Sequence, residues 1–375
     1  MTAYKQIDTK KTVVFCEALF GAYGFSPEES KIITDVLLRA DLYGIESHGV
    51  QRLVRYNDEI SSGQVDVKAK AAVVHETGIS AVMDANKAMG QLTSVSAMNL
   101  AIQKARNNGC GMVTVRNSNH YGIASYYTEM AAAQDLIGVC MTNTEAICVP
   151  TFGSQAMTGT NALALAMPAD PVTFSYDAST TVVPRGTLEV YRKNGMPLPE
   201  HWALDKDGKP CTDAAVVIDN IIAKSGGGIN PLGGMGVLHG GHKGYGLSII
   251  VDIFSAVISG GLTSNYVNRK PGVNGICHYF MAIDYGIFGD KASIKAGLSK
   301  FLQELRDSKK AEGQSRIYTH GEKEAEMMKK RIASQIPVNE KTLAEMMNIA
   351  GKLQVDLFGN PVGSITSPAF FGLMS

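Results

Sequence analysis

The spacing of apolar residues predicts that the chain begins with helices. Apolar positions recur at helical spacing over residues 8–23, and Gly24 is a natural helix stop. A second helix is predicted over residues 26–42, because Ser26-Pro27-Glu28-Glu29 combines an N-cap, a proline at the first helical position and a capping-box glutamate. A third helix is expected to follow over residues 48–56.

Beyond residue 70 the pattern changes to short apolar runs that alternate with helical segments. The predicted strands are 71–74, 79–83, 111–115, 137–142 and 173–176. The predicted helices are 90–107, 121–133 and 245–259. This alternation indicates α/β layering.

The end of the chain predicts a discontinuous organisation. A glycine-rich irregular stretch spans residues 225–241, and the tail over 322–351 returns to helical character. We expect this tail to pack against the N-terminal helices. The predicted domains are therefore a helical domain of residues 1–70, completed by 325–375, and an α/β core of residues 71–324.

Composition and charge narrow the class of protein. Of the 375 residues 45% are hydrophobic and 19% are charged, which is ordinary for a globular protein. The 35 basic and 35 acidic residues cancel, so no net field attracts nucleic acid or an anionic membrane surface. The N-terminus lacks the apolar core of a signal peptide, and the six cysteines are scattered without a zinc-type spacing. These features predict a cytoplasmic protein with reduced thiols.

The first candidate site is the string from Glu46 to Tyr56. His48, Arg52 and Tyr56 stand four residues apart, so a helix here projects all three from one face. A proton carrier, a guanidinium and a phenol together suit the binding of a small carboxylic acid and the movement of a proton on its neighbouring carbon. The alternative is an ordinary helix start with a solvated histidine and arginine.

The second candidate is Asn117-Ser118-Asn119-His120, which lies between a predicted strand and a predicted helix. Loops at strand ends are where α/β folds place reactive side chains. His120 is therefore a candidate acid/base, and the alternative is a capping loop with an incidental histidine.

Further strings carry groups suited to an anion. Thr144 follows a strand, Gly159-Thr160-Asn161 brings glycine next to small polar side chains, and Asp177-Ala178-Ser179 follows a strand-like run. Lys243 lies in a glycine-rich loop before an apolar helix, which suits a phosphate. Ordinary turns, caps and a solvated lysine are the alternatives.

Several well-known motifs are missing from the sequence. No G-x-G-x-x-G follows a strand, so a conventional Rossmann site is not supported. The loop at Lys243 also fails the P-loop pattern. His239 and His242 have no third ligand nearby, so no metal site is predicted.

Taken together, these strings resemble those of the malate/L-lactate dehydrogenase family, which also includes ureidoglycolate, sulfolactate, diketogulonate and cyclic-imine enzymes. The matching strings run in family order: Gly44 to Gly49 with Arg52-Leu53, Asn117 to Gly122, Pro150 to Gly153, Gly159 to Asn161, Asp177 to Thr180, Gly195, Pro197 to Pro199, Trp202 to Asp205, Gly241 to Leu247, Phe288 to Asp290 and His320 to Glu322. Each is weak alone, and together they are highly specific.

The resemblance implies a non-Rossmann NAD(P)-binding core with a mixed sheet, and reduction of a 2-oxo acid to a 2-hydroxy acid or the reverse. By position, His120 would be the acid/base, Arg52 would bind the substrate carboxylate, and Ser47, His48 and Tyr56 would line the same pocket. The resemblance places the following residues at NAD or NADP: Thr144, Asp177, Ala178, Ser179 and Lys243, with Gly321 and Glu322 near the adenosine end. It also implies a homodimer or a higher assembly, with sites near the subunit interface.

The sequence departs from the family pattern at three places. Ala178 stands where the family usually has methionine, and Ala162 stands where it usually has proline. The run over residues 214–238 looks longer than in the family and carries extra glycines, as a lid or surface insertion would. These departures bear on the cofactor contacts more than on the reaction.

The resulting prediction is a nicotinamide-dependent 2-hydroxyacid oxidoreductase. Malate/oxaloacetate is the first substrate pair, because malate is the commonest label in the family, and lactate/pyruvate is the next. Rivals within the same fold act on ureidoglycolate, sulfolactate or a cyclic imine. A second substrate carboxylate would need another cation near Arg52, for which Arg55 is a candidate. A catalytically silent nucleotide-binding protein is the rival from another class.

Overall fold

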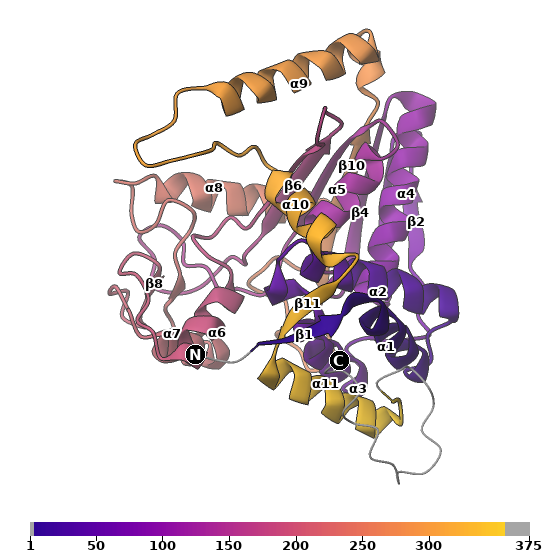
Figure 1. Cartoon of the computed structure of the whole chain (residues 1–375). Helices are drawn as coiled ribbons and strands as arrows, with labels where there is room; N and C mark the ends of the chain where they lie inside the picture. The colour runs from indigo at the N-terminus through magenta and orange to yellow at the C-terminus, as the bar shows by residue number, and fades with distance from the viewer. Residues whose placement is uncertain (1–3, 357–375) are drawn as a thin grey trace.

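A seven-stranded mixed sheet forms the centre of the protein (Figure 1). The structure is a computed structural model that describes residues 4–356. The strand order is β2-β3-β4-β10-β5-β6-β7. Their bounds are β2 Ala72–Glu76, β3 Ser80–Asp84, β4 Cys110–Ser118, β5 Ile137–Thr142, β6 Ala162–Met167, β7 Phe174–Ala178 and β10 Ile276–Ile283. Within this sheet β3 and β4 are parallel and the other neighbours are antiparallel, so the predicted mixed sheet is confirmed and the parallel Rossmann order is absent from it.

Strand β10 lies between β4 and β5 and pairs antiparallel with both. Strands β4 and β5 therefore run in the same direction, and their C-terminal ends lie at the same edge of the sheet. In the register, His278 lies opposite Val115 of β4 and Thr142 of β5. The segments that follow these two strands contain His120 and Thr144, so the pairing of β10 brings two distant candidate strings to the same edge.

Both faces of the sheet are covered by helices. Figure 1 shows the sheet between α4 (Gly90–Asn108) on one side and α8 (Gly241–Asp252) on the other. Successive residues of β10 alternate between the two sides: Phe280 belongs to the core under α4 and α5 (Ala124–Ala132), whereas Tyr279 packs with Val251 of α8. A π-helical turn, η3 (Ile253–Val257), continues α8.

The N- and C-terminal segments share a separate hydrophobic core. It is built from α1 (Thr9–Ala22), α2 (Pro27–Leu42), α3 (Leu53–Ser61), β11 (Gln335–Asn339) and α11 (Glu340–Leu353). The predicted packing of the tail against the N-terminal helices is therefore confirmed. The proposed division into domains stays a prediction, and its residues 1–3 and 357–375 lie outside the described residues.

Two local predictions are wrong. The first concerns the tail, which is not helical throughout. Strand β11 lies between α10 (Glu322–Arg331) and α11 in the chain, and it pairs antiparallel with β1 (Tyr4–Asp8) at the N-terminus. Strand β11 has five residues, in which Ile336 and Val338 alternate inward, too short a run for its period to be separated from a helix.

The predicted helix over residues 48–56 is interrupted. It consists of two 3₁₀ turns, η1 (Glu46–His48) and η2 (Val50–Arg52), followed by α3. The break occurs at Gly49, whose ψ of −145° is not helical. The next backbone N–H, of Val50, donates to the Asp41 side chain instead of to a helical carbonyl.

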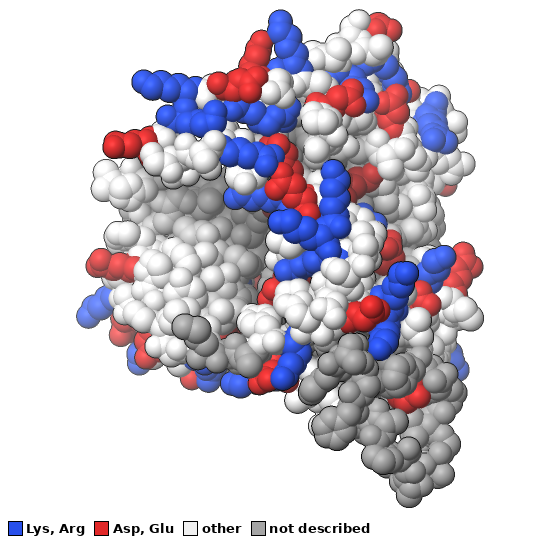
Figure 2. All heavy atoms as spheres, viewed as in Figure 1, with Lys and Arg blue, Asp and Glu red and all other residues white. Residues whose placement is uncertain are grey.

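The remaining elements surround the sheet. Residues 182–229 form a small unit with its own core. It contains α6 (Arg185–Asn194), β8 (Ala203–Leu204), α7 (Ala214–Ala223) and β9 (Gly228–Ile229). The expected irregular stretch thus includes a short strand, and the run over 214–238 contains a helix. A short turn, η4 (Tyr285–Phe288), precedes α9 (Lys291–Asp307), which lies along one end of the molecule, where Figure 2 shows many Lys and Arg side chains. No helix within residues 4–356 is long and apolar enough to cross a bilayer.

Candidate active site

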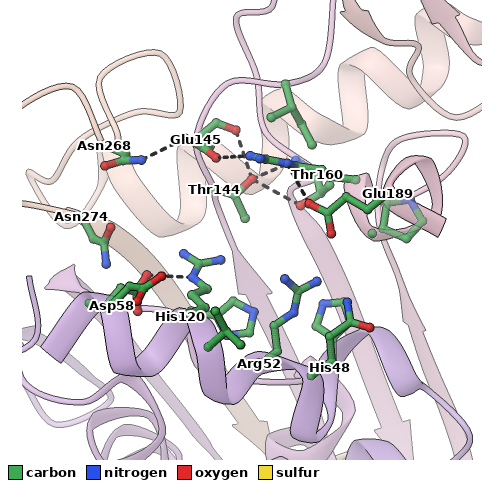
Figure 3. A pocket seen from close by; sticks show the side chains of 18 of the residues that line it. His48, Arg52, Asp58, His120, Thr144, Glu145, Thr160, Glu189, Asn268 and Asn274 are labelled. Atoms are coloured by element: carbon green, nitrogen blue, oxygen red, sulfur yellow. Dashed lines mark hydrogen bonds and ion pairs between the residues drawn. The ribbon is translucent and has the colours of Figure 1, made fainter. Parts of the chain in front are cut away.

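A cavity of about 590 Å³ opens at the sheet edge where β4 and β5 end. It brings together four of the residues that the sequence singled out, His48, Arg52, His120 and Thr144. Figure 3 shows His48, Arg52 and His120 side by side, with Thr144 on the opposite wall. Elements far apart in the chain therefore meet in one space, as the two histidine strings predict.

The loop after β4 fixes the position of His120. Asn119 is buried, and its amide nitrogen donates to the carbonyls of Lys87 (3.0 Å) and Ala88 (2.9 Å). Its carbonyl accepts from Asn274 at 2.7 Å. Gly90 at the start of α4 lies so close that a Cβ there would stand 2.3 Å from the His120 carbonyl oxygen. The imidazole is thus carried on a backbone held from both sides.

Tyr56 supports His120 from behind. Its hydroxyl is 2.9 Å from His120 Nδ1, and the Tyr56 side chain is fully buried. The expectation that Tyr56 lines the pocket is corrected, because the cavity lining does not include it. With Nδ1 engaged by the phenol, Nε2 is the ring nitrogen left for a ligand.

His48 stacks on His120, with ring centroids 5.7 Å apart and planes at 28°. The Ser47 hydroxyl is 2.9 Å from His48 Nδ1, so one ring nitrogen of each histidine is held by a hydroxyl. Ser47 is not in the lining of the main cavity and instead borders a smaller one of about 80 Å³.

Two arginines enter the cavity from neighbouring turns. Arg52 donates through Nε to the Ser47 carbonyl at 2.5 Å and has no carboxylate partner among the described residues. Arg55 donates through Nε to the buried Glu59 at 2.7 Å. Each of these two bonds fixes the Nε edge of its own guanidinium group and leaves the terminal nitrogens available to a planar anion.

The electrostatics keep both histidines neutral. Burial and the nearby Arg52 and Arg55 lower the pKa of His48 to about 3. Burial, followed by Arg55, His48 and Arg52, also lowers the pKa of His120 well below its usual value. A neutral imidazole surrounded by cations is ready to accept a proton once an anion offsets those cations.

The opposite wall is a charged clamp. Arg185 on α6 pairs with Glu145 at 2.9 Å and with Glu189 at 3.2 Å (Figure 3). The Thr144 hydroxyl accepts from the Thr160 backbone N–H at 3.0 Å, and a Cβ on Gly159 would stand 2.2 Å from it. The ion pairs of Arg185 join α6 to the loop after β5, and the bond between Thr144 and Thr160 joins that loop to the turn before β6.

The other predicted binding residues lie outside this cavity, along β7 and beyond. Asp177 and Ala178 are the last residues of β7 rather than the start of a loop, and Asp177 accepts from the Ser125 N–H at the start of α5 (2.8 Å). The Ser179 hydroxyl donates to the Thr181 carbonyl at 3.2 Å. The strand leads to Thr180, whose N–H donates to the Thr160 carbonyl at 2.8 Å, so β7 ends beside the cavity.

Gly321 and Glu322 lie at the other end of β7. Ser175 donates to the His320 carbonyl at 3.2 Å, and a Cβ on Gly321 would stand 2.7 Å from the Thr173 carbonyl, so this loop is pressed against the strand. Gly321 borders a separate cavity of about 450 Å³. Glu322, the first residue of α10, accepts from the backbone N–H of Thr319 in the loop before the helix.

Lys243 is exposed in the first turn of α8, next to Gly240. The adjoining Gly244 packs on Leu232, which donates to the Thr180 carbonyl at 2.8 Å. The start of α8 is therefore near the cavity end of β7, and the positive end of its helix dipole favours an anion.

Comparison with known proteins agrees with this geometry. Residues 7–347 match the malate/L-lactate dehydrogenase family. A malate dehydrogenase of Pyrococcus horikoshii is 42% identical over 94% of this chain and 97% of its own. The chain belongs to the malate/L-lactate dehydrogenase family. The resemblance inferred from the sequence is thereby confirmed.

Two further relatives extend the comparison. An L-sulfolactate dehydrogenase of Methanothermobacter thermautotrophicus is 32% identical over 94% of this chain and 98% of its own. The crystal structure of malate dehydrogenase from Entamoeba histolytica superposes with a TM-score of 0.91 and 34% identity, covering 94% of this chain and 99% of that one. As a member of this family the protein is an oxidoreductase of hydroxy and oxo acids.

The family implies a nicotinamide cofactor, and the described residues fit one. Thr144 and Thr160 line the main cavity, Gly321 borders the cavity of about 450 Å³, and β7 runs between these two places. The four residue steps of β7 from Phe174 to Ala178 span about 13 Å at the rise of a β-strand. Thr144 lies at the cavity end of this track and the start of α8 offers N–H groups beside it.

Sequence reasoning missed the clamp on the far wall. Arg185 and Glu189 have the ordinary i, i+4 spacing of a helix ion pair, which does not by itself indicate a site, so only their meeting with Glu145 in space reveals the clamp. It also missed His278, a buried β10 histidine whose ring lies 2.8 Å from the Thr142 hydroxyl and 3.0 Å from that of Ser118. The strand pattern around His278 gave no signal for either bond.

The cations beside His120 lead to a prediction for Arg55→Met. Removing a cation that lowers the pKa of His120 should move that pKa upward towards 6.5, because less charge opposes protonation. Ring NMR titration of the free enzyme measures the shift, with His120→Gln assigning the signal. A His120 pKa that stays fixed or falls in Arg55→Met would contradict this account of the site.

Proposed function

We propose that this protein is an NAD(P)-dependent malate dehydrogenase that interconverts oxaloacetate and malate. The observation that carries the proposal is the pair Arg52 and Arg55 in the same cavity as His120. Two cations beside one acid/base suit a substrate with a carboxylate on each side of the reacting carbon. The 42% identical malate dehydrogenase relative supports the same substrate.

Arg52 binds the carboxylate next to the reacting carbonyl. Its Nε is fixed by the Ser47 carbonyl, and it has no ion-pair partner in the described part of the chain, so its free edge suits a bidentate carboxylate. His48 lies beside it and completes the orientation of the substrate.

Arg55 binds the second carboxylate. Its Nε is held by Glu59, which fixes the plane of the guanidinium and leaves the terminal nitrogens towards the cavity. A monocarboxylate such as pyruvate brings no second anion to the terminal nitrogens of Arg55, whose Nε stays bonded to Glu59. The cavity therefore favours oxaloacetate over pyruvate.

His120 moves the proton at the substrate oxygen. In malate oxidation the neutral ring accepts the hydroxyl proton at Nε2 while Nδ1–H donates to the Tyr56 oxygen. In the reverse direction the imidazolium returns that proton to the ketone oxygen. The two substrate carboxylates offset Arg52 and Arg55, which raises the pKa of His120 in the complex and makes both protonation states accessible.

The nicotinamide ring, when bound, supplies or accepts the hydride. Thr144 at the cavity wall is assigned to its nicotinamide end. Asp177, Ala178, Ser179 and Lys243 are assigned to the middle of the cofactor, and Gly321 and Glu322 to the adenosine end. NADH and NADPH are to be tested side by side.

A second candidate is sulfolactate, whose sulfonate and carboxylate also require two cations. The 32% identical sulfolactate dehydrogenase favours it over ureidoglycolate, cyclic imines and lactate. Malate and sulfolactate would both bind Arg52 and Arg55, so the site geometry does not distinguish them. The kcat/KM values for oxaloacetate and sulfopyruvate distinguish them instead.

The proposed reaction is tested with a panel of oxaloacetate, pyruvate, sulfopyruvate and a cyclic imino acid, each with NADH and NADPH. We expect the highest kcat/KM with oxaloacetate. His120→Gln should lower kcat by about 10²-fold or more, because the proton carrier is lost. A folded wild-type enzyme that reduces no panel member, or a His120→Gln variant at the wild-type rate, would sink this assignment.

The role of Arg55 is tested by substrate selectivity. Arg55→Met should lower kcat/KM for oxaloacetate about tenfold or more, because hydrogen bonds to a charged group are lost, and should change the value for pyruvate much less. Arg192→Met on the outer face of α6 is the matched control. Equal losses for both substrates would show that Arg55 serves the fold rather than the second carboxylate.

We further propose that the enzyme is a homodimer joined through the outer face of α8 and η3. This face exposes a run of large apolar side chains: Ile250 (42%), Ile253 (43%), Phe254 (38%), Val257 (57%) and Ile258 (50%). Exposed apolar patches of this kind mark protein–protein contacts. A second copy of the chain is the occupant that the family resemblance supports.

The dimer is tested with Val257→Asp. A charge at the centre of the patch should convert the enzyme to a monomer, because burying an unpaired carboxylate in the interface is unfavourable. Light scattering after size-exclusion chromatography measures the mass, and Val14→Asp on the exposed side of α1 is the control. A wild-type monomer at micromolar concentration would contradict the proposal.

A further inference from the structure

Asp41 is a buried carboxylate just outside the cavity, at the C-terminal end of α2. It is 2% exposed, and its Oδ2 accepts the backbone N–H of Val50 at 2.8 Å. A buried carboxylate is unfavourable unless it is hydrogen-bonded, so its position demands a reason. Val50 lies between His48 and Arg52, the two residues to which substrate orientation is assigned.

Gly49 shows how closely the carboxylate approaches this loop. A Cβ on Gly49 would stand 2.0 Å from Asp41 Oδ1 and 2.1 Å from Asp41 Cγ. This clash alone excludes a side chain at residue 49. The glycine thus allows the carboxylate to lie directly against the peptide that follows His48.

The bond from the Val50 N–H to Asp41 takes the place of a bond to a helical backbone carbonyl. The chain from Glu46 to Arg52 forms two separate 3₁₀ turns, and the N–H that begins the second turn is held by Asp41. The first turn carries Ser47 and His48, and the second ends in Arg52, which returns to the Ser47 carbonyl. A single carboxylate therefore sets the junction of the two turns.

Charged and titratable groups approach Asp41 from three elements. Glu46 on η1 raises its pKa and Arg331 at the end of α10 lowers it, while Cys16 of α1 lies near enough for Asp41 to raise the thiol pKa. Arg331 also donates to the Asp41 backbone carbonyl at 2.5 Å and pairs with Glu46 at 3.7 Å. The surroundings thus contain both signs of charge.

We propose that Asp41 is the positioning residue of the loop from Glu46 to Arg52, and that its ionised form is the one that holds His48 and Arg52 in place for the substrate. The inference rests on the proposed roles of those two residues. An N–H bonded to a carboxylate is held roughly twice as strongly as one bonded to a neutral acceptor. Protonation therefore weakens the bond without removing the oxygen.

The ionisation falls in an accessible pH range. Burial raises the pKa of Asp41 to about 7. A carboxyl whose folded-state pKa is raised contributes stability that is complete below its unfolded pKa, about 3.9, and is lost as pH rises through the folded value. Higher pH thus strengthens the hold on the loop while it lowers the stability of the fold.

The test compares Asp41→Asn, which keeps an acceptor oxygen but never ionises, with Asp41→Ala, which removes the acceptor. Asp41→Ala should raise the KM for oxaloacetate about tenfold or more with a smaller change in kcat, because a hydrogen bond to a charged group is lost. The ratio of wild-type to Asp41→Asn KM should approach one at low pH and fall as pH rises through 7. Thermal unfolding should show the wild type losing stability relative to Asp41→Asn over pH 4 to 7.

A measurement independent of turnover accompanies the kinetics. Amide hydrogen exchange of the peptide containing Val50 should accelerate in Asp41→Ala and in Gly49→Ala, because both break the contact. Unchanged exchange and KM in Asp41→Ala, or a wild-type to Asp41→Asn KM ratio that does not vary with pH, would overturn the inference. If exchange accelerates but the wild type reduces no 2-oxo acid, the proposed function fails and the hold on the loop stands; if turnover occurs but Arg52→Ala leaves KM unchanged, only the assignment of Arg52 fails.

Discussion

The pairing of β10 with both β4 and β5 is the constraint on which the site depends. It makes the two flanking strands end at the same edge, about 10 Å apart at two interstrand spacings. His278 reinforces this arrangement because its ring bridges the hydroxyls of Ser118 on β4 and Thr142 on β5. Burial lowers the pKa of His278 to about 3, so the ring stays neutral and serves as a structural bridge rather than a charge. His120 and Thr144 lie close together because they follow the two strands that this bridge joins.

The chemistry of the cavity follows from a shortage of negative charge next to the histidines. Arg52 lacks a carboxylate partner among the described residues and Arg55 has one, so the free enzyme holds more cation than anion around His120. The far wall is balanced differently, because Arg185 lies between two glutamates. An anionic substrate is thus attracted by the side of the cavity that contains Arg52 and Arg55, whereas the wall at Arg185 encloses the substrate without a net charge interaction. Substrate binding and tuning of the acid/base are one electrostatic event.

The sequence predicted what depends on local pattern and on family strings. The mixed sheet, most helices and the meeting of His48, Arg52 and His120 were accessible, because periodicity and motif order carry that information. It did not predict the break at Gly49, since a glycine within a helical pattern is ambiguous until the Asp41 carboxylate is placed beside it. It also misplaced Tyr56, because equal spacing along a helix does not say which side chain faces the cavity and which lies behind another residue.

The contact between Asp41 and Gly49 also limits how this chain can vary. Any side chain at residue 49 collides with the carboxylate, while a smaller residue at 41 opens the space that such a side chain needs. Substitutions at the two positions are therefore not additive, and a change that is damaging alone is less so when its partner has already changed. The short string before Arg52 is thus energetically coupled to a residue on the preceding helix, even though the two lie eight positions apart.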